Sequence, residues 1–422
     1  MPVALPLGLV QQVGAPPLSG CRALLLLLLS FPTSSQTSRQ ARSVEPKIPF
    51  NKHFITGKEA GYISQAISSG SIAADGPFTR SCARLLEERF GILKVLMTPS
   101  CTSALEMAAT LCNLSPGDEV IMPSFTFVST ANAVARAGAK PVFVDIRPDT
   151  LNIDEQQIES AISAKTKALI PVHYAAVACE MDEIMAAANK HGLRVIEDAA
   201  QGVNAFYKGR ALGSIGHLGA YSFHDTKNYI SGEGGALCLN SPELVERAEI
   251  IREKGTNRSQ FLRGEVDKYT WVDVGSSYLP SEIACAFLYA QLEAIDEITA
   301  RRRDVYETYR RLVSPLEEDG LVSLLHAPQG CETNYHIFGI LVRDESTRNR
   351  LMAHLKASGI NAVFHYVPLH TSPMGTKLGY RAGDLRATEE LSGRLLRLPL
   401  FPELTPTDQV RVVNTMRAFL DR

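Results

Sequence analysis

The feature that most constrains the fold is a regular alternation of short apolar segments with longer amphipathic segments, between about residues 94 and 240. The short segments include KVLMT, DEVIMPS, KPVFVDI, TKALIPVH and LRVIEDAA, and most are separated by segments with apolar residues at helical spacing. Such alternation predicts a mostly parallel sheet with helices on both faces. The apolar segments are continuous, as expected for strands that are covered on both faces. We therefore expect an α/β fold.

The pattern changes near residue 279, where a long helical stretch begins that ends at RRLVSPL. This change predicts a large α/β domain over residues 46–285, and a linking helix with a smaller α+β domain over residues 286–422. Residues 1–45 surround the apolar run CRALLLLLLSF, which is too short to span a bilayer. This segment has features of a signal or transit peptide. We favour a disordered tail or a mis-assigned start, because the cysteine usage downstream is typical of an intracellular protein.

The composition excludes some classes of partner. Lysine and arginine number 43 against 45 acidic residues, which gives a formal net charge of -2. Such a balance provides no strong field for nucleic acid or for an anionic membrane surface. The eight cysteines form no C-x-x-C pair, which favours free thiols in a reducing compartment over disulfides or structural zinc. We therefore expect a cytoplasmic protein that binds neither nucleic acid nor membrane, and no metal site.

Candidate site residues follow five predicted strands, where parallel strands place their carboxyl ends along one edge of a sheet. In chain order these residues are Ser100 to Thr102, Phe125 to Phe127, His173, Asp198 with Gln201, and Ser222 to Lys227. Each one alone has a structural explanation. Ser100 and Thr102 have the side chains of helix caps, Phe127 is most simply a core aromatic, and His173 is most simply a buried histidine with satisfied hydrogen bonds.

The whole set, however, matches the needs of pyridoxal phosphate. This cofactor requires a lysine that binds its aldehyde, an acid beside its pyridine nitrogen, and donors for its phosphate. Lys227 and Asp198 supply the first two. A helix start at Ser100, Cys101 and Thr102, together with Ser222, supplies the phosphate donors, and Phe127 supplies an aromatic face for the ring. No glycine fingerprint for nucleotide binding is present.

The segments VIEDAAQ and SFHDTKNYISGEGG resemble signatures of the DegT/DnrJ/EryC1/StrS sugar aminotransferases, and the resemblance extends from about residue 48 to the C-terminus. It implies a fold-type-I, pyridoxal-phosphate-dependent homodimer or higher oligomer with its sites at the subunit interface. By this resemblance Gln201 contacts the ring hydroxyl of the cofactor, and Ser277 reaches the phosphate across the dimer. Two positions depart from the family pattern: Cys101 stands where many members have glycine, and Ser277 stands where many have asparagine.

The segments LMTPSCTSALEMAA, PVHYAAVACEMD and AVFHYVPLH resemble, more narrowly, the dTDP-4-amino-4,6-dideoxygalactose transaminases. That subgroup uses glutamate to aminate dTDP-4-keto-6-deoxyglucose, for surface polysaccharides such as enterobacterial common antigen. A nucleotide sugar needs cationic donors for its diphosphate, for which we expect Arg258 and Arg263, and a sugar contact is expected from His365. Two alternatives stay open. One is a sugar dehydratase, in which histidine replaces the lysine, and the other is a non-catalytic regulatory protein.

Overall fold

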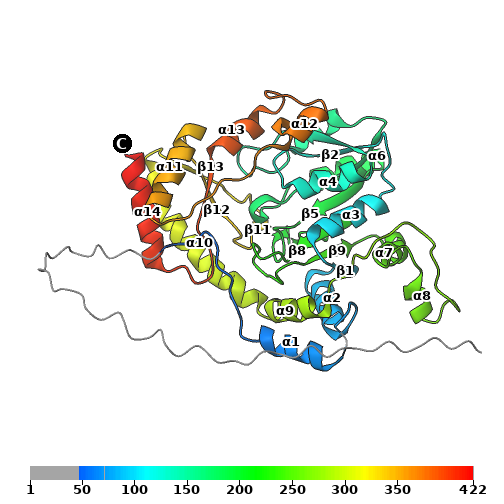
Figure 1. The fold of residues 1–422 in the computed structure, drawn as a ribbon. Coiled ribbons are helices and arrows are strands. Elements are labelled where there is room, and N and C mark those ends of the chain that lie inside the picture. The colour runs from blue at the N-terminus through cyan, green and yellow to red at the C-terminus, as the bar shows by residue number, and fades with distance from the viewer. Residues whose placement is uncertain (1–46, 71, 422) are drawn as a thin grey trace, which may run out of the picture. The chain divides into compact units, whose positions relative to one another are not determined.

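The computed structural model describes residues 47–70 and 72–421, which belong to one compact unit, Pro46–Arg422. At its centre lies a sheet of seven strands in the order β1-β9-β8-β5-β4-β2-β3 (Figure 1). Strands β8, β5, β4, β2 and β3 are mutually parallel, whereas β9 is antiparallel to both of its neighbours. The predicted α/β fold with a mostly parallel sheet is therefore confirmed. The strands are β1 (Lys94–Thr98), β2 (Glu119–Pro123), β3 (Lys140–Val144), β4 (Thr166–Leu169), β5 (Arg194–Asp198), β8 (Leu218–Ser222) and β9 (Gly235–Leu239).

Helices cover both faces of this sheet, as the continuous apolar strands predicted. Alternate residues of one strand enter different cores: Val95 and Met97 of β1 join one buried cluster, and Leu96 joins the other. This division follows from the two-residue repeat of a strand. The first cluster receives α2 (Pro77–Phe90), α6 (Met181–His191) and α9 (Glu282–Glu293), and the second receives α3 (Cys101–Leu111), α4 (Val128–Arg136) and α7 (Val245–Arg252). The remaining helices before α9 are α1 (Glu59–Ser68), α5 (Ile158–Ala161) and α8 (Arg258–Leu262).

The C-terminal part has a core of its own around a three-stranded sheet, β10-β12-β13. Its long helix α10 packs against the last helix, α14 (Figure 1). The elements are α10 (Ile295–Glu318), β10 (Ser323–Leu324), β12 (Phe338–Leu341), α11 (Glu345–Ala357), α12 (Pro373–Lys377), α13 (Arg386–Arg394), β13 (Leu395–Leu398) and α14 (Pro406–Leu420). A third small sheet pairs β11 (Cys331–Glu332) with β6 (Phe206–Tyr207), which in turn pairs with β7 (Arg210–Ala211).

One sequence expectation needs refinement. The long helical stretch consists of two helices, α9 and α10, which meet at Ala294. Between β3 and β4 the chain forms a turn of 3₁₀ helix, Glu155–Gln157, followed by the short α5. Helix α9 packs into the core of the large sheet, and the domain boundary after residue 285 stays a prediction. Within residues 47–70 and 72–421, no helix is long and apolar enough to cross a membrane. The expected tail, residues 1–45, lies outside the described residues.

Candidate active site

Lys227 lies in a tight loop that extends the antiparallel pairing of β8 and β9. The Phe223 amide donates to the carbonyl oxygen of Gly234 at 2.9 Å, and the Ser231 amide donates to that of Phe223 at 2.8 Å. The Lys227 amide donates to the carbonyl oxygen of His224 at 2.9 Å, which closes the turn. These bonds fix the backbone, so that the lysine is held at the end of the central sheet. Its side chain is partly buried.

The surroundings of Lys227 favour a neutral amine. Burial lowers its pKa from the ordinary value, because an apolar environment penalises the charged form. The neighbouring Cys101 and Asp198 oppose this shift, and the Arg397 cation adds to it. A lysine with a lowered pKa is a better nucleophile at neutral pH than a solvated surface lysine.

Asp198 ends β5, two positions from β9 in the sheet order. Its Oδ2 accepts a hydrogen bond from the Thr130 hydroxyl at 2.7 Å, and its Oδ1 accepts one from the Ala200 amide at 3.2 Å. The residue is buried. These two bonds hold the carboxylate in one orientation and leave lone pairs available on both oxygens.

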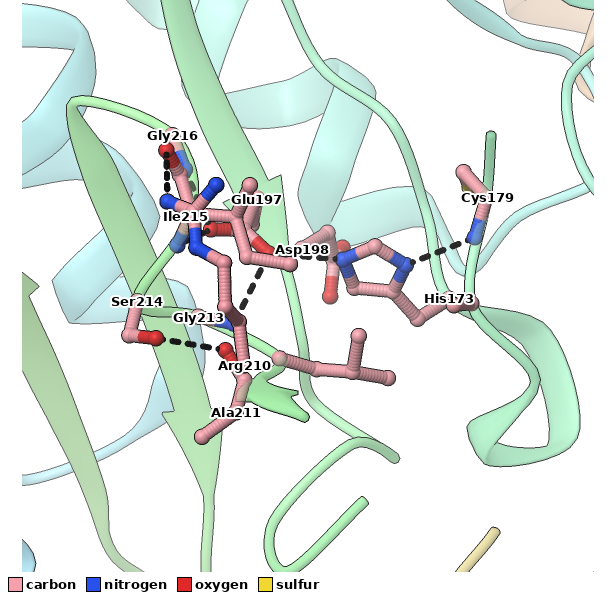
Figure 2. Close-up of polar contacts among 12 residues, drawn as sticks. His173, Cys179, Glu197, Asp198, Arg210, Ala211, Gly213, Ser214, Ile215 and Gly216 are labelled. Atoms are coloured by element: carbon pink, nitrogen blue, oxygen red, sulfur yellow. Dashed lines mark hydrogen bonds and ion pairs between the residues drawn. The ribbon is translucent and has the colours of Figure 1, made fainter. Parts of the chain in front are cut away.

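His173 and Glu197 form a buried pair behind this carboxylate (Figure 2). His173 Nε2 lies 2.9 Å from Glu197 Oε2, and its Nδ1 accepts a hydrogen bond from the Cys179 amide at 3.1 Å. Because Nδ1 accepts, the proton is on Nε2 and is donated to Glu197. Both ring nitrogens are therefore satisfied by the protein, which confirms the structural explanation for this histidine.

The start of α3 meets the end of β8 across Gly235. This glycine pairs with Thr98 of β1 on one side and with Ser222 of β8 on the other. A Cβ atom at Gly235 would lie 2.3 Å from the Ser100 carbonyl carbon and 2.4 Å from the Cys101 nitrogen. The first turn of α3 can approach this closely to the paired ends of β8 and β9 because this residue has no side chain. The amides that begin a helix have no partner within it, and they suit an anion.

Ser100 and Thr102 occupy this helix start as predicted. Ser100 is the N-cap and accepts a hydrogen bond from the Ser103 amide at 3.1 Å. The Thr102 hydroxyl lies 2.8 Å from the hydroxyl of Ser129 on α4. Ser100 therefore caps the helix, and the structural explanation for this residue is confirmed. A capping role is compatible with a site for an anion at the same helix end.

Phe127, Gln201 and His365 lie around one tyrosine, Tyr366. Phe127 is 58% exposed, so its interpretation as a core aromatic is wrong, and the centroid of its ring is 6.3 Å from that of Tyr366. Gln201 Nε2 donates to the Tyr366 hydroxyl at 3.2 Å, and Gln201 Oε1 accepts from the Ala175 amide at 2.7 Å. The His365 ring stacks on that of Tyr366 with centroids 3.7 Å apart. Burial, together with the Arg397 cation, lowers the pKa of His365 to about 2, so His365 is neutral.

The comparisons with known proteins agree with this geometry. A model of the DegT/DnrJ/EryC1/StrS aminotransferase family matches residues 54–417. The chain belongs to this family. Pyridoxal phosphate is therefore its cofactor, and it is a member of a family of sugar aminotransferases.

Three proteins illustrate how similar this chain is to other proteins. A pleiotropic regulatory protein of Geobacillus stearothermophilus is 39% identical over 320 residues, which cover 75% of this chain and 82% of that protein. The spore coat polysaccharide biosynthesis protein SpsC of Bacillus subtilis is 32% identical over 378 residues, or 88% and 96% of the two chains. The crystal structure of a DegT/DnrJ/EryC1/StrS aminotransferase from Brucella abortus has a TM-score of 0.79 at 31% identity, and covers 86% of this chain and 96% of that one.

The residues at the site of this family member fit its cofactor. A pocket is lined in part by Gln201, Ser222 and Lys227, together with Ala200 and His336. It thus brings an amine with a lowered pKa close to a hydroxyl and an amide at the carboxyl ends of β5 and β8. An aldehyde, a ring hydroxyl and a phosphate require these kinds of group.

Asn334 and His336 also line this pocket, and no motif in the sequence identifies them. Asn334 Nδ2 donates to the carbonyl oxygens of Gln201 and Val203, at 2.7 Å each. Asn228, beside the lysine, donates to the carbonyl oxygen of Asn334 at 2.8 Å, and its Oδ1 lies 2.8 Å from His336 Nδ1. The only signal in the sequence is a pair of polar residues in NYHIFGILV, directly before an apolar strand.

In the described part of the chain, three predicted site residues form no hydrogen bond or ion pair with the residues that line this pocket. Arg258 pairs with Glu253 at 3.0 Å, and Arg263 pairs with Glu249 at 2.7 Å and with a second glutamate. Ser277 is exposed and forms an isolated bridge with Glu253. No contact within residues 47–70 and 72–421 joins these three residues to Lys227, and their roles in binding stay predictions.

Proposed function

We propose that the chain transfers an amino group from glutamate to C4 of a nucleotide-linked 4-keto-6-deoxy sugar, with dTDP-4-keto-6-deoxyglucose as substrate and dTDP-4-amino-4,6-dideoxygalactose as product. The observation that carries this proposal is the position of Lys227. Its amine is partly buried and has a lowered pKa, and the lysine belongs to the same pocket as Gln201 and Ser222. Membership of a family of sugar aminotransferases supports the class of acceptor.

In this proposal each residue has a defined task. Lys227 would hold the cofactor's aldehyde through Nζ, and Asp198 would accept a hydrogen bond from the pyridine nitrogen and keep it protonated. Gln201 would contact the ring hydroxyl, and Phe127 would provide an aromatic face for the ring. The start of α3, at Ser100, Cys101 and Thr102, would bind the phosphate together with Ser222. The bound cofactor supplies an electron sink for the carbanion that forms at the reacting carbon.

The proton transfer is assigned to Lys227. The amine of Lys227 would take the proton from the α-carbon of the donor and hold it for the return transfer, since burial lowers the pKa of this lysine and favours its neutral form. The Thr130 hydroxyl and the Ala200 amide keep Asp198 aligned during both halves of the reaction. Glutamate leaves as its 2-oxo acid, and its nitrogen ends on C4 of the sugar.

The finer features of the proposal follow the sequence resemblance. They are a homodimer in which Ser277 reaches the partner's cofactor, a diphosphate contact from Arg258 and Arg263, a sugar contact from His365, and a cytoplasmic protein that serves polysaccharide synthesis. SpsC, which is named for spore coat polysaccharide biosynthesis, is similar to this chain over most of its length. Lys227 itself argues against the dehydratase alternative.

The decisive experiment is a set of absorption spectra of the protein loaded with pyridoxal phosphate, recorded before and after addition of glutamate. Wild type should show the visible band of covalently bound cofactor, and glutamate should bleach it. Lys227→Ala should lack the band. The control is Lys208→Ala, which removes an exposed lysine that pairs with Asp182 and should behave as wild type.

Addition of dTDP-4-keto-6-deoxyglucose after the glutamate should restore the band in wild type and yield the amino sugar by mass spectrometry. A protein that binds the cofactor but responds to neither compound would favour the regulatory alternative, in line with the name of the Geobacillus relative. A protein that binds no pyridoxal phosphate would contradict the assignment of the site.

A further inference from the structure

One side chain of the candidate pocket, His336, has no task in the proposed function. It lines the same pocket as Lys227 and Ser222. His336 comes from the segment shortly before β12, in the C-terminal part of the chain, whereas the lysine comes from the loop after β8. Long-range packing therefore brings the imidazole and the amine into one pocket.

A buried arginine of α10 fixes the backbone of the segment that carries this histidine. Arg302 Nε donates to the carbonyl oxygen of Tyr335 at 3.1 Å, and its Nη2 donates to that of His336 at 2.7 Å. Asn334 of the same segment is anchored to the carbonyl oxygen of Gln201 at 2.7 Å. The position of His336 in the pocket is thus fixed from two sides.

The hydrogen bonds of Asn228 define the tautomer of the His336 ring. Asn228 Nδ2 donates to the carbonyl oxygen of Asn334 at 2.8 Å, so its Oδ1 is the acceptor that faces His336 Nδ1 at 2.8 Å. The proton of the neutral ring is therefore on Nδ1, and Nε2 has a free lone pair. Nε2 forms no hydrogen bond with the residues that the structure describes.

The surroundings keep the His336 ring neutral. Burial lowers its pKa well below the ordinary value, and the cations of Lys227 and Arg302 add to this shift. Arg397 and the His365 ring act in the same direction. Nε2 is therefore a hydrogen-bond acceptor and not a proton carrier. Such an acceptor suits a cationic donor, and it does not suit a carboxylate or a phosphate.

Lys227 supplies a donor that lacks a partner. Its Nζ forms no hydrogen bond or ion pair with any residue in the described part of the chain. An ammonium group has three N–H donors, and a donor that is removed from water without a partner is costly. The pocket thus contains an unused donor and, on His336, an unused acceptor. Asn334 Oδ1 also has no partner, but this atom is inaccessible.

We propose that His336 is a positioning residue for Lys227, and that its Nε2 accepts a hydrogen bond from the lysine ammonium whenever the lysine is not joined to the cofactor. This inference rests on the proposed function, in which Lys227 takes a proton from the donor's α-carbon and later returns it. The histidine makes and breaks no covalent bond, and the proton stays on Nζ while Nε2 accepts the hydrogen bond. The contact keeps the charged amine beside the place of transfer.

The test compares His336→Phe, which removes the acceptor, with His336→Gln, which supplies an amide oxygen in place of Nε2. The control is His326→Phe, because His326 is exposed and pairs with Glu317 at 3.8 Å. The first measurement is the pKa of Lys227 in the cofactor-free chain, by competitive acylation and mass spectrometry. The second is the rate at which glutamate, with and without deuterium on its α-carbon, bleaches the visible band of the cofactor-loaded protein.

We expect His336→Phe to lower the Lys227 pKa further, by about one unit, because the ammonium form loses a hydrogen bond that involves a charged group. A purely packing role of the ring would give the opposite sign, since a loosened pocket admits water and returns the pKa toward 10.5. His336→Gln and His326→Phe should stay close to wild type.

The bleaching rate should show the same order of variants. His336→Phe should slow bleaching at saturating glutamate by about tenfold, and α-deuteration should slow it further, because the proton transfer becomes limiting. The glutamate concentration that gives half of the maximal rate should change by no more than about twofold. His336→Gln should recover most of the rate.

A Lys227 pKa that is unchanged or raised in His336→Phe would overturn the inference. Equally slow bleaching in His336→Phe and His336→Gln, with the wild-type Lys227 pKa in both, would also overturn it. If His336→Phe does not fold, the smaller substitution His336→Leu decides by the same measurements. If the Lys227 pKa falls as expected but glutamate leaves the visible band of wild type unchanged, the contact with His336 stands and the proposed transamination fails.

Discussion

His173 donates a hydrogen bond through Nε2 to Glu197 Oε2 at 2.9 Å, and both side chains are fully buried. The same carboxylate also accepts from the amides of Gly213, Ile215 and Gly216 at 2.8, 2.6 and 2.6 Å (Figure 2). Glu197 directly precedes Asp198, so one residue of β5 anchors the loop after β7 while the next faces the candidate site. The strand end is thereby fixed by a group that has no contact with the pocket.

Glu197→Gln should therefore destabilise the fold. The substitution replaces one acceptor oxygen by an amide donor, which then faces groups that are donors themselves. With two hydrogen bonds lost in a buried site, we expect a decrease of about 2–4 kcal/mol in the free energy of unfolding. Urea unfolding of the cofactor-free chain measures this decrease in the free energy of unfolding. The control Glu243→Gln affects an exposed pair with Arg194 and should leave the midpoint almost unchanged. Equal midpoints for the two variants would contradict this account of Glu197.

Gly235→Ala should weaken cofactor binding more than it weakens the fold. The new methyl group would meet backbone atoms of Ser100 and Cys101 at 2.3–2.6 Å, so the start of α3 must move away from Gly235 and the end of the sheet. A titration with pyridoxal phosphate should show a loss of about tenfold or more, since the phosphate donors are displaced.

The matched control for this change is Gly61→Ala in the exposed helix α1. A Cβ atom there meets no atom within 4 Å, and alanine favours a helix over glycine by about 1 kcal/mol. This variant should bind the cofactor as wild type does. Wild-type cofactor affinity in Gly235→Ala would show that the close approach at this glycine is unimportant for the site.

Much of the large sheet and of the candidate site could be predicted because local signals coincide with tertiary structure there. Each strand from β1 to β9 that reads as a continuous apolar run is buried on both faces, and the polar residues that follow β5 and β8 reach one pocket. Asp198 and Lys227 follow directly from the carboxyl-end rule for parallel strands.

The remaining site residues could not be predicted, because long-range packing brings them there. Asn334 and His336 precede a short strand of a different sheet, and their hydrogen bonds reach Gln201 and Asn228, which are distant in the chain. Arg397 lies in the four-residue strand LLRL, whose pattern resembles that of any short buried segment. Its guanidinium contacts Phe50 and the backbone of Phe364, which are far away in sequence. A rule for local periodicity contains no information on such contacts.

The variant Phe127→Ala should show whether the Phe127 side chain contributes to cofactor binding or to the stability of the fold. Because the Phe127 ring is 58% exposed, its removal should change the free energy of unfolding by no more than about 0.5 kcal/mol. Loss of contact with the cofactor ring should reduce pyridoxal phosphate affinity by about two- to tenfold. Phe125→Ala is the matched comparison: that ring is 1% exposed, and its loss should cost about 3–5 kcal/mol. A large stability loss in Phe127→Ala would refute the assignment.

Lys227→Met should stabilise the cofactor-free chain in a pH-dependent way. The Lys227 pKa is lowered in the folded state by burial, so the unfolded chain binds more protons at pH values between that lowered pKa and the ordinary value of 10.5. Stability contributed by this group therefore rises with pH across that window. Methionine carries no charge, and its advantage over wild type should be greatest below the lowered pKa and should fade toward pH 10.5.

Urea unfolding of the two cofactor-free proteins at several pH values, from about 7 to about 10, measures this difference. Lys208→Met is the control, because the pKa of this exposed lysine is shifted in the opposite direction. A hydrogen bond to Asp182 raises the pKa of Lys208. Its removal deletes a favourable interaction of the charged amine, so this variant should gain no stability at neutral pH. The stability difference between Lys227→Met and wild type could instead be constant over the whole pH range. Such a result would mean that Lys227 titrates at its ordinary pKa. Its assigned task as a neutral proton acceptor would then lose its physical basis.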